Sequence, residues 1–401
     1  MHKFIEKGTI TTVNGIKAAG IHCGLKKKNK DLALIISQYP CSAAGTFTLN
    51  KIVAAPVLIS KEVIENKNKV RAILVNSGNA NACTGEQGMK DALHTQQYLA
   101  DKLNISKNEV IISATGVIGK QLPMDNILNG IDEIVSKTNV QSGKDAAEAI
   151  MTTDLVSKSF AVQVALDEGK IIIGGICKGS GMIMPNMATM LAFLATDAEI
   201  ESDILQKLLV SSVKESFNKI SVDGETSTND MVILLANGAS GIKIKEGTEN
   251  YSRFLNGLLA ITTEMAKAIA NDGEGATKLI QVVAENTKTK EDADKIAKAI
   301  SNSPLVKTAL YGNDANWGRI LSAAGNTGVN FNPANVTIKF GDLAVLLPNY
   351  KVMANEVKLT EALNKKEVKI SIDLAEGDES STWYTCDYTE NYIKINSRYR
   401  T

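Results

Sequence analysis

The segment from Lys178 to Leu191 has the residue types that acyl transfer by a threonine needs. It reads Lys-Gly-Ser-Gly-Met-Ile-Met-Pro-Asn-Met-Ala-Thr-Met-Leu, so glycines and a proline precede Thr189 and an apolar stretch follows it. A threonine hydroxyl is a weak nucleophile unless a base lies within hydrogen-bond reach. The chain has 3 histidines, all far upstream of Thr189, and nothing in the sequence signals a Ser-His-Asp triad.

Cleavage of the peptide bond before Thr189 would supply the missing base. The freed α-amino group has a reference pKa of about 7.7–8.0, which suits proton transfer near neutral pH. The Thr189 hydroxyl can make the cut itself by attacking the carbonyl of Ala188, whose small side chain leaves room, and water then hydrolyses the resulting ester. We therefore predict self-cleavage between Ala188 and Thr189, although composition alone favours an ordinary glycine-rich loop before a buried strand.

A phosphate-binding loop is the alternative for this glycine-rich segment, since glycine-rich turns before helices bind anions. The order Lys178-Gly179-Ser180 is not the Gly-Lys-Ser/Thr of such loops, and the Walker spacing is absent. An apolar strand, not a helix, is expected to follow. The sequence therefore disfavours a nucleotide site.

The length of the motif around Thr189 makes a chance match improbable, and it resembles the self-processing signature of the ornithine acetyltransferase (glutamate N-acetyltransferase) family. The resemblance spans nearly the whole chain. Its further motifs are Asn76–Gly85 (NSGNANACTG), Ala114–Gly119 (ATGVIG), Ser221–Asp230 (SVDGETSTND), Asp272–Lys278 (DGEGATK) and Tyr311–Arg319 (YGNDANWGR).

The resemblance implies an α+β fold, namely an N-terminal-nucleophile-like layered αββα sandwich with an additional α/β lobe. It also implies an α chain of residues 1–188 and a β chain of residues 189–401 that stay together, usually as α2β2. The implied reaction moves acetyl from N2-acetyl-L-ornithine to L-glutamate in the cyclic arginine pathway by a ping-pong cycle through acetyl-threonine. That cycle needs no cofactor, and some members of the family also accept acetyl-CoA as donor.

The same resemblance gives roles to individual residues. The oxyanion of acyl transfer needs preorganised donors, and it places these at the Thr115 hydroxyl and the Gly116 N–H. The positions that match the family's substrate contacts are Thr152, Lys178, Thr189, Glu274, Asn396 and Thr401. From charge, we expect Lys178 to bind a substrate carboxylate and Glu274 a substrate ammonium. The choice of Thr152 over its neighbour Thr153 stays open.

A self-processing aminopeptidase or amidase of related fold is the competing function. It would use the same nucleophile but pass the acyl group to water. The residue types do not separate the two enzymes, whereas acceleration of ornithine release by glutamate would. An interaction protein without catalysis is the least favoured class, because it would not need these motifs around one threonine.

Composition sets the wider limits. The 401 residues include 44% hydrophobic and 22% charged residues, with 44 basic and 44 acidic side chains, so a large core is expected and no net field attracts nucleic acid or anionic membranes. The 5 cysteines lack a CxxC pair, which predicts buried, inert thiols in a reducing compartment. No signal sequence is evident, and we expect a cytoplasmic protein. The acidic clusters at Asp223-Gly224-Glu225 and Asp314-Ala315-Asn316 lack EF-hand spacing, so no metal site is predicted.

The elements that must position these residues follow from the hydrophobic pattern. Strands are predicted at 32–36, 72–75, 110–112 and 368–374, a hairpin over 160–174, and a hairpin turn at Asn14-Gly15. Helices are predicted near 85–103, 205–217 and 251–270, with Ser202 or Asp203 as the cap of the second. Strands and helices segregate along the chain, which favours helices packed over largely antiparallel sheets.

Overall fold

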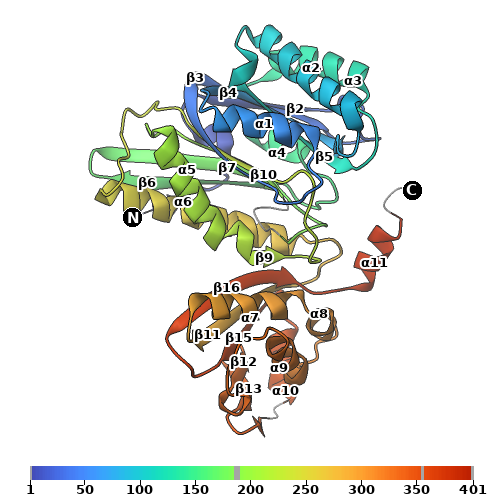
Figure 1. Cartoon of the computed structure of the whole chain (residues 1–401), viewed down its shortest axis with the longest axis vertical. Helices are drawn as coiled ribbons and strands as arrows, with labels where there is room; N and C mark the ends of the chain where they lie inside the picture. The colour runs from blue at the N-terminus through green and yellow to red at the C-terminus, as the bar shows by residue number, and fades with distance from the viewer. Residues whose placement is uncertain (1, 185–189, 354–355, 399–401) are drawn as a thin grey trace. The chain divides into compact units, whose positions relative to one another are not determined.

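The computed structural model describes residues 2–184, 190–353 and 356–398. Within it the chain forms two compact units (Figure 1). The first unit comprises Met1–Gly179, Pro185–Asn218 and Glu225–Met265, and the second comprises Ser180–Met184, Lys219–Gly224 and Ala266–Thr401.

A 9-stranded sheet forms the frame of the first unit, in the order β1-β6-β7-β8-β10-β3-β4-β5, with β2 paired to β3. The long strand β3 pairs with β2 and β4 near its start and with β10 near its end, so it joins two halves of the sheet. The strands are β1 (His2–Phe4), β2 (Ile16–Ile21), β3 (Leu32–Phe47), β4 (Val70–Asn79), β5 (Val110–Val117), β6 (Lys158–Leu166), β7 (Gly169–Lys178), β8 (Leu191–Thr196) and β10 (Met231–Ala236).

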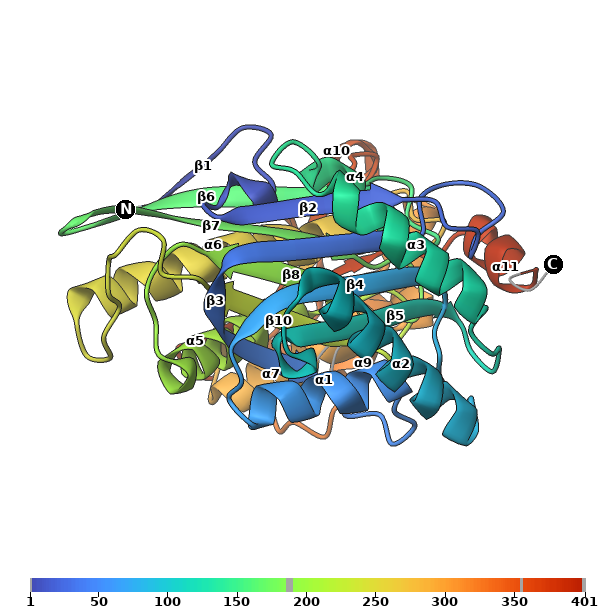
Figure 2. The ribbon, with the colours of Figure 1, turned by 90° about the horizontal axis from the view of Figure 1, so that it is seen from above.

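Period-two alternation in the strands divides the first unit into layers. Along β3, Leu32 and Leu34 face a core shared with α2 and α3, whereas Ala33 and Ile35 face a central core shared with β7, β8 and β10. Figure 2 looks onto α2 and α3, with β2–β5 behind them. The helices that begin in this unit are α1 (Ala55–Glu65), α2 (Gly85–Leu103), α3 (Met124–Lys137), α4 (Gly143–Ala149), α5 (Ser202–Glu215) and α6 (Glu249–Asn271), with single 3-10 turns at Ile10–Thr12, Lys107–Glu109 and Phe217–Lys219.

Helix α6 covers the outer face of β6 and β7. A Cβ atom on its Gly257 would lie 2.4 Å from a methyl carbon of Val164, and one on Gly175 of β7 would lie 2.7 Å from Met265 Cε. The order of layers is therefore helices, sheet, sheet, helix, which confirms the predicted αββα sandwich. The pairing is mostly antiparallel, also as predicted, with β4–β5 and β8–β10 as the parallel pairs of this sheet.

The second unit is built on a 7-stranded mixed sheet in the order β14-β13-β12-β15-β11-β16-β9, and its core lies between this sheet and helices α7, α8 and α9. It forms the additional α/β lobe. Its strands are β9 (Ile220–Ser221), β11 (Leu279–Thr287), β12 (Thr337–Phe340), β13 (Leu343–Leu347), β14 (Lys351–Val352), β15 (Glu367–Asp373) and β16 (Glu379–Cys386). Its helices are α7 (Lys290–Asn302), α8 (Pro304–Tyr311), α9 (Trp317–Gly325), α10 (Glu356–Leu363) and α11 (Glu390–Asn396), with a 3-10 turn at Pro333–Asn335.

Two local predictions were wrong. Asn14-Gly15 does form a turn, with Gly15 at φ +80°, but the turn joins a 3-10 helix to β2 and not two strands. The cap of α5 is Glu201, which makes no side-chain capping bond, so neither Ser202 nor Asp203 is the cap. In the first case tertiary pairing decides the local structure, because β2 pairs with β3 instead of folding back on the preceding residues.

The cysteines are only partly as predicted. All 5 are free thiols, and Cys41, Cys177 and Cys386 are buried. Burial raises the pKa of Cys41 to about 11 and that of Cys177 to about 12, so these thiols are inert. Cys83 is exposed, however, and lies at φ +56° in the loop before α2. None of the described helices is long and apolar enough to span a membrane.

Candidate active site

The predicted nucleophile lies in the connection between two neighbouring strands. Strand β7 ends at Lys178 and β8 begins at Leu191, and these two residues face each other in the antiparallel pair. Ala188 and Thr189 lie outside the described residues, as does Thr401. The segment that follows Thr189 enters the middle of the sheet, because β8 also pairs with β10 on its other side.

Thr115 and Gly116 lie at the end of β5, which continues to Val117, beyond the predicted end of the strand. Thr115 is half-buried. Gly116 has φ +129°, and a Cβ atom there would lie 2.4 Å from the carbonyl carbon of Gly78 and 2.6 Å from the N atom of Asn79 on β4. Glycine is therefore required here by close approach to a neighbouring strand.

Asn229 fixes the backbone that leads to Thr115. Its side-chain amide donates to the carbonyl of Ala114 at 2.8 Å and to the carbonyl of Ala80 at 2.6 Å, and its own oxygen accepts a 2.6 Å bond from the Thr228 hydroxyl. Asn229 is buried. The sequence pointed to this motif without giving the asparagine a role.

Asp154 connects Thr152 with Gly179, the residue that follows Lys178. Its carboxylate accepts the N–H of Thr152 at 3.0 Å and the N–H of Gly179 at 2.9 Å, and it pairs with Lys158 at 2.7 Å. Burial acts to raise the pKa of Asp154, but the charges of Lys178 and Lys158, together with these hydrogen bonds, hold it below its ordinary value. Asp154 is therefore an anion that positions both Thr152 and the residue after Lys178.

A second buried carboxyl lies beside the start of β8. Asp230 accepts a bond from the Met190 N–H, and the Met231 N–H of the same segment donates to the Met190 carbonyl at 3.1 Å. Burial raises the pKa of Asp230 well above its ordinary value, against the opposing charge of Lys178. One of its carboxyl oxygens has no hydrogen-bond partner among the described residues. This carboxyl group is therefore harder to ionise than an exposed aspartate.

The second unit brings Glu274 and Asn396 together. The Asn396 side-chain amide donates to the buried Glu274 carboxylate at 2.7 Å, and the Glu274 N–H donates to the Ser180 carbonyl at 3.2 Å. A Cβ atom on Gly181 would lie 2.3 Å from Glu274 Oε2, so this glycine makes room for the carboxylate. Two residues predicted from the family motifs, 122 positions apart, thus contact each other.

Asp223 binds the glycine-rich segment that follows β7. Its two carboxylate oxygens accept the N–H groups of Met182 at 2.7 Å and Ile183 at 2.8 Å, and the Tyr392 hydroxyl donates to it at 3.2 Å. This carboxylate holds the glycine-rich segment in place within the second unit. Within residues 2–184, 190–353 and 356–398, no cluster of three or more metal-ligating side chains occurs.

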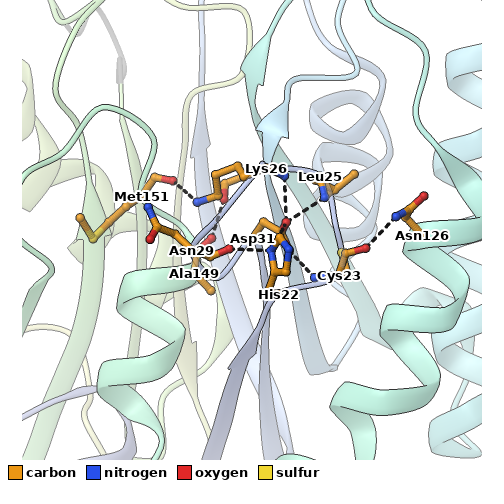
Figure 3. Close-up of polar contacts among 10 residues, drawn as sticks. His22, Cys23, Leu25, Lys26, Asn29, Asp31, Asn126, Ala149 and Met151 are labelled. Atoms are coloured by element: carbon orange, nitrogen blue, oxygen red, sulfur yellow. Dashed lines mark hydrogen bonds and ion pairs between the residues drawn. The ribbon is translucent and has the colours of Figure 1, made fainter.

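The loop between β2 and β3 forms a polar cluster that the sequence did not single out (Figure 3). The Asp31 side chain, fully buried, accepts backbone N–H groups from Cys23 at 2.6 Å, Leu25 at 2.8 Å and Lys26 at 2.9 Å. Its carboxylate also lies 3.1 Å from His22 Nδ1. The Lys26 ammonium donates to the carbonyl of Met151 at 2.9 Å, the residue before Thr152. No motif in the sequence marks this lysine, because its role depends on a contact between distant segments.

The first unit thus contains the Thr115–Gly116 end of β5, the Asp154 carboxylate, the buried Asp230 carboxyl group, and the lysines Lys26 and Lys178. Acyl transfer needs such a set of positioned donors and charges around a nucleophile. The second unit, by itself, contains the carboxylate–amide pair of Glu274 and Asn396.

Comparison with known proteins identifies the family. A sequence model of the ArgJ family matches residues 17–401. The arginine biosynthesis bifunctional protein ArgJ of Oceanobacillus iheyensis is 46% identical over 398 residues, which cover 99% of this chain and 97% of that protein. The protein of the same name from Listeria monocytogenes (strain EGD-e) is 46% identical over 98% of this chain and 99% of its own.

Among solved structures, the ornithine acetyltransferase of Mycobacterium tuberculosis complexed with ornithine is 36% identical, with a TM-score of 0.44, over 47% of this chain and all of that chain. The family model covers nearly the whole chain, and two relatives exceed two fifths identity over almost their full length. The chain belongs to the ArgJ family.

Proposed function

We propose that this protein is a glutamate N-acetyltransferase that moves acetyl from N2-acetyl-L-ornithine to L-glutamate in arginine biosynthesis. Its relatives carry the name arginine biosynthesis bifunctional protein, and a solved relative is named ornithine acetyltransferase. The motifs around Thr189, Thr115 and Glu274 agree with that activity.

The proposed enzyme cleaves itself between Ala188 and Thr189. Residues 1–188 then form an α chain and residues 189–401 a β chain, and two copies of each assemble as α2β2. Support comes from the sheet: β7 belongs to the first chain, β8 and β10 to the second, and β8 lies between β7 and β10. A cut in the connection leaves this pairing intact, so the two chains stay together without a covalent link.

In the proposed cycle, Thr189 attacks the acetyl carbonyl of acetylornithine, with its own α-amino group as the base. The Thr115 hydroxyl and the Gly116 N–H stabilise the oxyanion, ornithine leaves, and the glutamate amine collects the acetyl group from the threonine oxygen. Lys178 binds the substrate α-carboxylate. The other substrate contacts come from Thr152, Glu274, Asn396 and Thr401. The cycle needs no cofactor.

The observation that carries this proposal is the pairing of Lys178 with Leu191. The pairing places the buried Lys178 opposite Leu191, two positions after the proposed nucleophile. An amino-acid substrate needs a carboxylate-binding group close to its reacting amide. The carboxyl groups of Asp154 and Asp230 both interact electrostatically with Lys178 and help to hold the chain around this lysine in position.

The test is an assay of both products. Purified protein is given N-acetylornithine with and without glutamate, and ornithine and N-acetylglutamate are measured by mass spectrometry. The proposal predicts equal amounts of the two products and faster ornithine release with glutamate. Ornithine with free acetate, independent of glutamate, would instead identify the self-processing amidase. A parallel sample with acetyl-CoA and glutamate tests the second donor.

A further inference from the structure

Lys26 lies where several of the proposed site segments meet. Its aliphatic stem packs on Gly78 of β4, since a Cβ atom on that glycine would lie 3.0 Å from Lys26 Cγ. Gly78 faces Gly116, the proposed oxyanion residue, in the pairing of β4 with β5. At its other end, the Lys26 ammonium donates to the carbonyl of Met151, next to Thr152 (Figure 3). One side chain therefore connects the end of β5 with a proposed substrate segment.

The loop that carries Lys26 is rigidly held. The buried Asp31 carboxylate accepts three backbone N–H groups of this loop, including that of Lys26 itself. The Asp31 carbonyl in turn accepts the N–H of Ser77, one residue before Gly78, at 2.9 Å. Bonds to a charged acceptor are the stronger kind, so they fix the loop backbone before any ligand arrives, and the Met151 carbonyl then holds the ammonium.

The electrostatic surroundings of Lys26 suit an anion. The ammonium is half-buried, and burial lowers its pKa, as does the charge of Lys178, while Asp31 and Asp154 act in the opposite direction. Asp154 already forms an ion pair with Lys158. Among the residues that the structure describes, Lys26 itself forms no ion pair, and one of its three donors is used, by Met151. Two donors and a partly desolvated charge are left for a ligand.

The two amino acids of the proposed reaction differ in charge. Acetylornithine carries one carboxylate and a distal ammonium, whereas glutamate carries two carboxylates. Lys178 accounts for the carboxylate that both have, but the second carboxylate of the acceptor needs a second cation.

We propose that Lys26 is the specificity-determining residue that binds the second carboxylate of the dicarboxylate acceptor, within the electrostatic reach of Lys178. This inference rests on the proposed function. The planar carboxylate would accept the two remaining N–H donors of the ammonium, and the rigid loop makes this contact selective for an acidic side chain over a neutral one of the same shape.

The experiment compares Lys26→Gln with Lys27→Gln, a matched change at the exposed neighbouring lysine. Initial rates give KM for glutamate and KM for acetylornithine separately. Loss of one charge-assisted contact corresponds to roughly 10- to 100-fold in affinity. We expect KM for glutamate to rise by about that factor in Lys26→Gln, KM for acetylornithine to change by less than about 3-fold, and Lys27→Gln to resemble the parent protein.

A second measurement compares two acceptors, glutamate and glutamine. In the parent protein, glutamate should exceed glutamine as acceptor by roughly 10- to 100-fold in kcat/KM, and Lys26→Gln should lose this preference. Equal use of glutamate and glutamine by the parent protein would overturn the proposal, as would equal rises of both KM values in Lys26→Gln. A parent protein that transfers acetyl to no acceptor would instead refute the proposed function, so the two failures are distinguishable.

Discussion

Replacement of Gly116 by alanine should destabilise the first unit through contact with β4. The new Cβ atom would lie 2.4 Å from the Gly78 carbonyl carbon and 2.6 Å from the Asn79 N atom, both backbone atoms that cannot move without opening the β4–β5 pairing. Forced overpacking costs roughly 1–3 kcal/mol, and a strained φ costs a further 1–3 kcal/mol or so. The expected loss in the free energy of unfolding is therefore about 2–6 kcal/mol.

Gly119→Ala is the matched control. Gly119 follows three residues later with φ +78°, and a Cβ atom there would meet nothing within 4 Å. This substitution carries the backbone strain alone, about 1–3 kcal/mol. Thermal unfolding of both variants, followed by circular dichroism with the same scan rate, isolates the contact with β4. Equal losses of stability in the two variants would refute the reasoning, because the close contact would then contribute nothing.

Other substitutions test the remaining contacts. Asp154→Asn should lower the free energy of unfolding by about 3–5 kcal/mol, because it removes the carboxylate that pairs with the buried Lys158 ammonium, and the further change Lys158→Met should recover part of that loss in chemical denaturation. The pKa of Asp230 is raised in the native state. At pH values between the ordinary pKa of an aspartate and this raised pKa, the native state therefore binds more protons than the unfolded state. Stability should therefore fall with rising pH in that window, and Asp230→Asn should remove this slope in denaturation series at several pH values. Glu274→Gln should raise KM for acetylornithine about 10-fold or more if its carboxylate binds the substrate ammonium, and unchanged kinetics would exclude it from the site. Limiting iodoacetamide should label Cys83 before the other four cysteines, which peptide mass mapping checks, because it is the exposed thiol.

Elements whose pattern is local could be predicted from the sequence. The helix Gly85–Leu103 begins and ends as expected, and the hairpin of β6 and β7 closes through Asp167 and Glu168 between paired Leu166 and Gly169. The alternation of apolar and polar residues likewise predicted the bounds of β15 to within one residue at each end. In these segments hydrophobic periodicity and turn chemistry agree, so no distant contact is needed to decide the structure.

Contacts between distant segments could not be predicted. Position 116 requires glycine because a Cβ atom there would meet the backbone of β4, and Asn229 has its role through the carbonyls of Ala80 and Ala114. Lys26 likewise has no sequence signal, since Met151 is 125 positions away. Family motifs indicated Glu274 and Asn396, but only the folded chain places the amide on the carboxylate. The predicted roles at Thr189 and Thr401 fall outside the described residues and stay predictions.

The central claim is that Thr189 becomes a new N-terminal residue and carries the acetyl group. The most direct test records intact masses of the purified protein under denaturing conditions, with and without N-acetylornithine and before any glutamate is added. Self-cleavage and acetyl transfer through Thr189 should give two polypeptides, residues 1–188 and 189–401, with the second gaining one acetyl group only when the substrate is present. A single uncleaved mass in fully active protein would contradict it.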